Sequence, residues 1–177
     1  MTTVATTDTA PPSHRWLRAG LILIAVLEFL DALSGVQNIF TDYHHPTAFL
    51  RFAQTLTSIK LALAPVIAGA ALVFAGKGNL RRAILALAAL ALALALVTWV
   101  LDDVWSIPIH GLELSPDYGG MVAFFHHFIF PAAALAGAAL ALKDRRLPLA
   151  GLLVSVPTLF NWAGVVAFTI AIIMYGF

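Results

Sequence analysis

The sequence predicts an all-α integral membrane protein, a five-helix transmembrane bundle with a cytoplasmic N-terminus and the C-terminus outside. Of its 177 residues, 61% are hydrophobic and 11% are charged, whereas soluble domains carry about 25% charged residues. Five apolar segments reach the roughly 20 residues that a helix needs to cross a bilayer. Basic residues gather in alternate loops, which indicates how the helices are oriented.

The polar, Thr-rich residues 1–14 carry two prolines and predict a disordered tail, followed by a single domain over residues 15–177. We expect the first apolar run to be a retained helix rather than a signal peptide, because it contains two acidic residues and lacks a small-residue cleavage site. Apolar and polar residues do not alternate with a period of two, so no strands are predicted. In chain order, the predicted spans are Leu17–Val36, Thr55–Gly76 (extended towards Pro46 if this proline takes the first turn), Ala83–Leu101, Met121–Leu142 and Pro148–Tyr175.

The distribution of charge predicts the topology. Eight of the ten basic residues fall on one side if the helices alternate: Arg15, Arg18, Lys77, Arg81, Arg82, Lys143, Arg145 and Arg146. Because short cytoplasmic loops are enriched in Lys and Arg, this side is predicted to face the cytoplasm, and Phe177 to lie outside. We therefore expect a protein of a bacterial inner membrane whose polar site faces the periplasm. A net charge of +1 gives no indication of nucleic-acid binding, and the absence of cysteine excludes thiolate metal sites.

Ionisable and amide side chains are predicted at a similar depth in four helices. With a rise of about 1.5 Å per residue, they lie roughly 8–20 Å below the outer helix ends. A charge at the bilayer centre costs at least ~2.5 kcal/mol, so these groups should face one another. They are Glu28, Asp31, Lys60, His126, His127 and Asn161. For Lys60 we predict an ion pair with Asp31, or with Glu28.

The pair His126-His127 lies in an apolar run that ends at Pro131. Adjacent helical residues are about 100° apart, so one ring is expected to face the bundle interior and to meet Glu28 or Asp31. Pro131 has no N–H for the carbonyl of His127, and the resulting local bend should widen the bundle there. Further along, small residues at Ala133, Gly137 and Ala141 predict close helix packing.

Imidazole and carboxylate together form the ligand set of zinc, iron and copper(II) sites. We predict a metal site with His126, His127, Glu28, Asp31 and His44 as candidate ligands, and His45 and His110 as further cofactor-binding residues. A divalent transition metal (zinc, iron or copper) is favoured over haem b, because only one helix carries histidines. No sequence-local metal motif is present, so this prediction depends on inferred depth alone.

Three classes of function remain open. The first is a membrane protein whose outer-facing site supports redox or hydrolytic chemistry on a lipid-soluble substrate. The second is a small-solute or proton-coupled transporter, favoured by Pro65 and Pro157 but opposed by the apolar inner half of the bundle. The third is an accessory subunit of a membrane complex. The sequence does not decide whether the protein is an enzyme, and its expected partners are membrane lipid and either a second copy or a membrane-complex subunit.

Overall fold

The computed structural model describes residues 12–40, 48–100 and 122–176, and these residues contain helices and turns but no strand. Five of the helices are long and apolar enough to cross a membrane, which confirms this part of the predicted fold class and is consistent with an integral membrane protein. The elements are α1 (Pro12–Val36), the 3-10 turn η1 (Gln37–Phe40), α2 (Ala48–Gly76), α3 (Leu80–Thr98), the π-helical segment η3 (Phe125–Ile129), α6 (Phe130–Leu142) and α7 (Leu147–Tyr175).

The helix boundaries lie close to the predicted ones. The first helix begins at Pro12, so the last three residues of the predicted tail belong to it, with the proline at a position that suits a helix start. The third begins at Leu80 because the side chain of Asn79 caps it, accepting a hydrogen bond of 3.2 Å from the backbone N–H of Arg82. The fourth candidate span is continuous from Val122 to Leu142 and includes η3 and α6.

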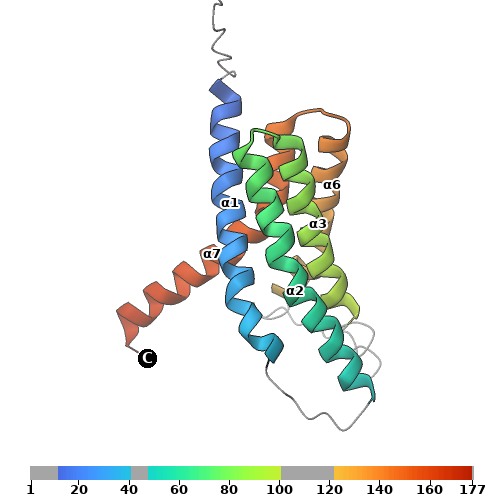
Figure 1. Cartoon of the computed structure of the whole chain (residues 1–177). Coiled ribbons are helices and arrows are strands. Elements are labelled where there is room, and N and C mark those ends of the chain that lie inside the picture. Colours follow the sequence, from blue (N-terminus) through green and yellow to red (C-terminus); the bar gives the residue numbers. More distant parts are fainter. Residues whose placement is uncertain (1–11, 41–47, 101–121, 177) are drawn as a thin grey trace, which may run out of the picture.

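The helices form a closed ring in the order α1, α2, α3, α6 and α7, with α7 packed back against α1. Figure 1 shows α1, α2, α3 and α6 side by side, while only the first half of α7 runs along them. The second half of α7 points away from the bundle. Hereafter this half, residues 161–175, is called the outer half of α7, because it lies outside the bundle.

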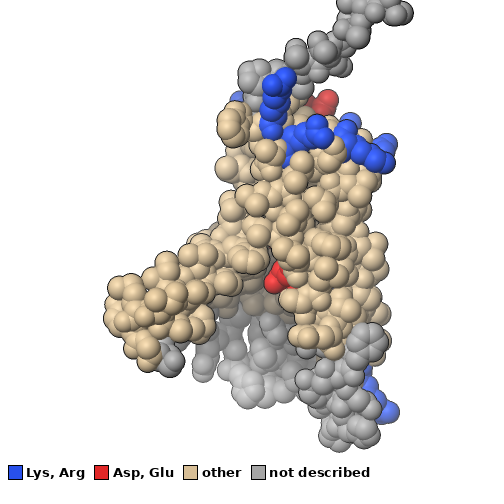
Figure 2. All heavy atoms as spheres, turned by 60° about the vertical axis from the view of Figure 1, so that its left-hand side comes forward, with Lys and Arg blue, Asp and Glu red and all other residues tan. Residues whose placement is uncertain are grey.

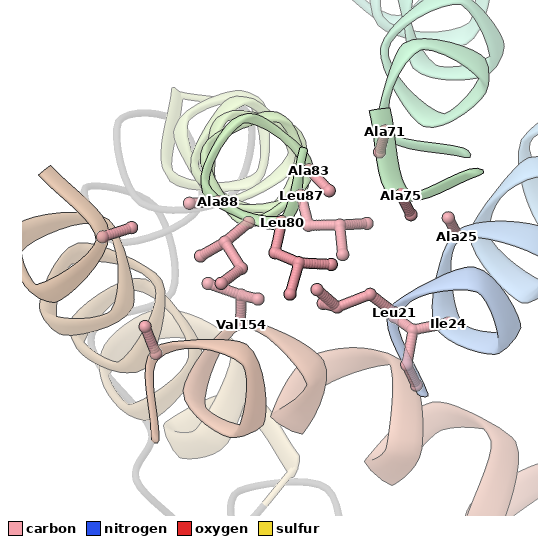
Figure 3. Packing of buried hydrophobic residues seen from close by; sticks show 13 residues of the cluster. Leu21, Ile24, Ala25, Ala71, Ala75, Leu80, Ala83, Leu87, Ala88 and Val154 are labelled. Carbon is pink, nitrogen blue, oxygen red and sulfur yellow. The ribbon is translucent and has the colours of Figure 1, made fainter. Parts of the chain in front are cut away.

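The half of the bundle next to the loops 77–79 and 143–146 is closed by an apolar core. Leu21 and Ile84 are almost completely buried there. Figure 3 shows Leu21, Leu80, Leu87 and Val154 pointing toward one another in the centre of this core. Many of the other core residues are alanines, which let helix backbones approach closely and gain dispersion contacts that lipid cannot replace.

The basic residues predicted to share one side of the membrane do lie together. Figure 2 shows most of the Lys and Arg side chains at one end of the molecule, which we call the basic end. Two of these arginines form hydrogen bonds with the C-terminal ends of helices. The Arg18 side chain donates to the carbonyls of Ala75 and Gly76, and Arg81 donates to the carbonyl of Leu142 at 2.9 Å. These bonds satisfy C-terminal carbonyls of α2 and α6 that have no partner within their own helix.

The contact between α6 and α7 depends on Gly137. A Cβ at this position would lie 2.6 Å from Cγ1 of Val154 and 3.0 Å from the backbone oxygen of Ala150. We expect Gly137→Ala to destabilise the protein by about 1–2 kcal/mol, because the two backbones must separate. The measurement is unfolding in mixed micelles followed by circular dichroism.

The matched control is Gly164→Ala, since a Cβ at Gly164 would meet no atom within 4 Å. This control should leave stability unchanged or raise it by up to ~1 kcal/mol through helix propensity. Equal effects of the two substitutions would contradict close packing at Gly137.

Candidate functional site

The bend of α7 follows from a proline inside the helix. Pro157 has no N–H, so the carbonyl of Leu153 loses its intrahelical donor and the helix is free to kink there. Beyond it, the outer half of α7 is exposed on nearly every side: Phe168 and Ile173 are 66% and 77% exposed. The kink therefore takes the outer half of α7 out of the ring formed by the other helices (Figure 1).

A cavity of about 250 Å³ lies at the level where α7 leaves the ring. Its apolar walls come mainly from α3, α6 and α7, including Leu90, Phe130 and Val154. Its polar lining comes from five elements, α1, α2, α3, η3 and α7, and consists of Glu28, Asp31, Lys60, Thr98, His126, Thr158 and Asn161. The structure thus brings together five of the six polar residues that the depth argument placed in one layer.

A short hydrogen bond crosses the cavity wall between α1 and α7. The hydroxyl of Thr158 donates to Oε1 of Glu28 at 2.5 Å. Thr158 is only 3% exposed, so its hydroxyl is held at a defined position one residue after the proline kink. A hydrogen bond to a carboxylate is stronger than one between neutral groups. Glu28 is therefore oriented by α7, and α7 is tied to α1 just before it leaves the bundle.

The two histidines take different directions, as expected from their spacing. His126 lines the cavity, and its ring meets the ring of Phe130 edge-on with centroids 4.8 Å apart. His127 does not line the cavity; its Nδ1 lies 2.7 Å from the backbone oxygen of Ala123. Only His126 is placed where it can act on a molecule in the cavity. No direct bond between His126 and a carboxylate of α1 is recorded among the described residues.

The helix around the histidines is wound as a π-helix, with the N–H of Phe130 bonded to the carbonyl of Phe125. Pro131 removes the donor that the carbonyl of His127 would otherwise use. The indole Nε1 of Trp99 donates to this carbonyl at 3.0 Å instead. Single π turns occur frequently at functional sites, and His126 lies within this one. The free carbonyl of His127 was predictable from the sequence, whereas its donor was not predicted.

Removing the indole donor should loosen this segment. We expect Trp99→Phe to destabilise the protein by about 1 kcal/mol, because the ring is kept while the carbonyl of His127 loses its partner. Unfolding in mixed micelles measures the loss. Trp16→Phe is the control, since Trp16 is 81% exposed at the basic end and should change nothing measurable. Equal stability of the Trp99 and Trp16 variants would contradict a supporting role for the indole.

The predicted ion pair of Lys60 with Asp31 stays a prediction. Both residues, and Glu28, line the same cavity. No direct ion pair between Lys60 and either carboxylate is recorded among the described residues. Asp31 and Asn161 are exposed, whereas Glu28 and Lys60 are half-buried. The cavity therefore has a closed side at Thr158 and an open side at Asp31.

The predicted metal site stays a prediction, because part of its ligand set lies outside the described residues. Among the described residues, no group of three or more His, Asp or Glu side chains is close enough to hold a metal ion. His44, His45 and His110 lie outside the described residues, so their predicted contribution to a metal or haem site stays a prediction. Within the described part of the chain, His126 and the two carboxylates of α1 share a cavity without forming a metal cage.

Comparison with known proteins gives no match: no family model fits the chain, and no curated protein or solved structure is significantly similar to it. The class of the site is therefore defined by its own residues. It is a polar cavity, with charges of both signs, inside an otherwise apolar helical bundle.

Proposed function

We propose that this chain is an integral membrane protein that binds the polar part of a lipid-soluble molecule in the cavity between its helices. The observation that carries the proposal is the convergence of polar side chains from five elements on one cavity of about 250 Å³. Polar groups within a bilayer are costly unless they are satisfied by other polar groups. A cavity of this size holds several waters or one small polar group, either of which satisfies them.

The proposed orientation places the basic end in the cytoplasm and the cavity nearer the outer side. The support is the gathering of Lys and Arg at one end of the bundle (Figure 2), as in short cytoplasmic loops. A reporter fused after Phe177 should then be active outside the membrane. Activity of the fusion in the cytoplasm would contradict this orientation.

The transporter alternative has less support in this conformation. A solute pathway needs polar groups that continue from the cavity to both sides of the membrane. Between the cavity and the basic end, the described part of the bundle is filled by the apolar core around Leu21, Ile84 and Leu87. Binding from the outer side is therefore favoured over passage through the protein.

A metal centre is the second candidate, supported by His126 and the two carboxylates of α1 on the walls of one cavity. With such a metal, redox or hydrolytic chemistry on the bound molecule becomes feasible. Metal analysis and a visible spectrum of the purified protein separate the cases. Stoichiometric zinc, iron or copper supports a non-haem site, and a Soret band supports haem. If a non-haem metal is present, His126→Ala should sharply reduce the metal content, whereas Phe124→Leu should not.

The cavity itself is tested by filling it. Ala91 lines the cavity on α3, and Ala89 lies on the exposed side of the same helix. Native mass spectrometry of protein purified from its membrane in mild detergent should show a bound molecule in the wild type and in Ala89→Phe. Ala91→Phe should lose it. An equal amount of bound molecule in both variants, or none in the wild type, would overturn the proposed function.

A further inference from the structure

The cavity carries unmatched charges of both signs on neighbouring helices. Glu28 and Asp31 are three residues apart on α1 and line it together, and Lys60 reaches it from α2. No ion pair joins these groups within the described part of the chain. Oxygen Oε1 of Glu28 is occupied by Thr158, but that hydroxyl carries no charge. A ligand that satisfies this lining must therefore offer a cation to α1 and an anion to α2.

The cavity is open on the side between α1 and the outer half of α7. Asp31 is exposed on the α1 side and Asn161 on the α7 side, and both line the cavity. The apolar neighbours Leu30 and Val165 are also about half exposed, at 53% and 52%. Figure 2 shows acidic atoms in a hollow beside the point where α7 leaves the bundle. The opening therefore faces sideways, toward the place that lipid occupies around a membrane protein.

The depth of Asp31 in the membrane indicates what kind of molecule can enter through this opening. Asp31 lies 13 residues after Arg18 on α1, or about 20 Å along the helix from the basic end. The hydrocarbon core of a bilayer is about 30 Å thick, so Asp31 is still within it. A carboxylate that faces lipid tails is strongly disfavoured. A molecule that enters through the side opening must therefore offer a polar group to Asp31, and its remaining parts must be apolar because they lie among lipid tails.

Resting on the proposed function, we propose that the cavity binds an amphiphile with a zwitterionic, primary-amine head group, of the phosphatidylethanolamine type. Its ammonium lies between Glu28 and Asp31, and its phosphate is directed to Lys60. Its acyl chains leave the cavity sideways, between α1 and the outer half of α7. The apolar side chains exposed along that half, such as Val165 and Phe168, then form a surface for the chains.

A primary ammonium matches the carboxylates of α1 better than other head groups do. Its three N–H donors can bond to Asp31 and to the second oxygen of Glu28, and charge-assisted bonds of this kind are the strong ones. A choline head group carries the same charge but offers no N–H donor. A purely anionic head group can meet Lys60 but leaves both carboxylates without a cation. The expected order is therefore ethanolamine, then choline, then glycerol.

The test uses the full-length protein in nanodiscs with equal amounts of dioleoyl phosphatidylethanolamine, phosphatidylcholine and phosphatidylglycerol. Native mass spectrometry after release reports which lipid is retained. We expect phosphatidylethanolamine to be enriched about tenfold over phosphatidylglycerol, as for one charge-assisted bond. Asp31→Asn should reduce this enrichment severalfold. Lys60→Gln should instead lower the retention of both lipids, because both carry a phosphate. Asp144→Asn, an exposed acid at the basic end, should leave the enrichment unchanged.

Each other outcome has a defined meaning. A retained lipid with no head-group preference in the wild type overturns this inference and leaves the proposed cavity function standing. Equal enrichment in the wild type and in Asp31→Asn also overturns it. Free phosphoethanolamine, added to delipidated protein, should compete at least tenfold more weakly than lysophosphatidylethanolamine. Equal competition would identify a water-soluble zwitterion and contradict entry from the side. Absence of any retained molecule in the wild type overturns the proposed function itself.

Discussion

If Lys60 forms the predicted ion pair with Asp31 or Glu28, replacing it by Met is expected to destabilise the protein by roughly 3–5 kcal/mol when the carboxylates remain charged. Met keeps the length of the side chain but removes the one Lys or Arg among the described residues that line the cavity. Glu28 and Asp31 are then left as two like charges three residues apart on one helix face, with no cation beside them. Proton uptake by one of them would reduce the loss. Unfolding in mixed micelles, followed by far-UV circular dichroism, gives the free-energy difference.

Arg51→Met is the matched control, because Arg51 lies on the same helix, nine residues earlier, with an exposed side chain that does not line the cavity. It should change stability by less than about 0.5 kcal/mol. The double substitution Lys60→Met with Asp31→Asn should recover part of the loss. If neither Asp31→Asn nor Glu28→Gln gives any recovery, Lys60 does not neutralise the charge of α1.

The long apolar helices of this protein were predictable because each one is set by a local property. Twenty or more apolar residues in a row are too long for a strand and long enough to cross a bilayer, so α2 and α7 end at the predicted residues Gly76 and Tyr175. The path of α7 was not predictable in the same way. A proline inside a helix, such as Pro157, indicates a break, but the direction taken after it depends on packing against α1 and α3, which no local pattern contains.

In the candidate site, too, local properties were predictable and contacts between helices were not. The shared depth of Glu28, Asp31, Lys60, His126 and Asn161 followed from counting residues along helices, and the structure brings all five to one cavity. Thr158 and Trp99 were missed because their roles depend on contacts between helices. A signal existed for each: Thr158 follows Pro157 directly, and Trp99 is an indole donor near the end of the helix preceding the His pair, where Pro131 leaves a carbonyl free. The roles predicted for His44, His45 and His110 stay predictions.

Removing the hydroxyl of Thr158 is expected to have the next largest effect, a loss of about 2–3 kcal/mol. Thr158→Val preserves the shape of the side chain but takes away the only donor recorded for Oε1 of Glu28 among the described residues. Glu28 is half-buried, and water in the cavity can replace the hydroxyl only in part. The same bond joins α1 to α7 beside the kink, so its loss should also free the first half of α7 to move away from α1.

Two measurements separate the chemical loss from a packing effect. Thr158→Ser keeps the hydroxyl and should retain most of the stability, whereas Thr158→Val should not. The chain has no cysteine, so spin labels at Leu23→Cys and Leu159→Cys, both at exposed positions, report the separation of α1 and α7. The distance distribution should broaden in Thr158→Val and stay narrow in Thr158→Ser. The cavity opens between these two helices. An unchanged distance distribution together with wild-type stability in Thr158→Val would mean that α7 is held by packing alone. The hydrogen bond to Glu28 would then neither orient the carboxylate nor restrict the side opening.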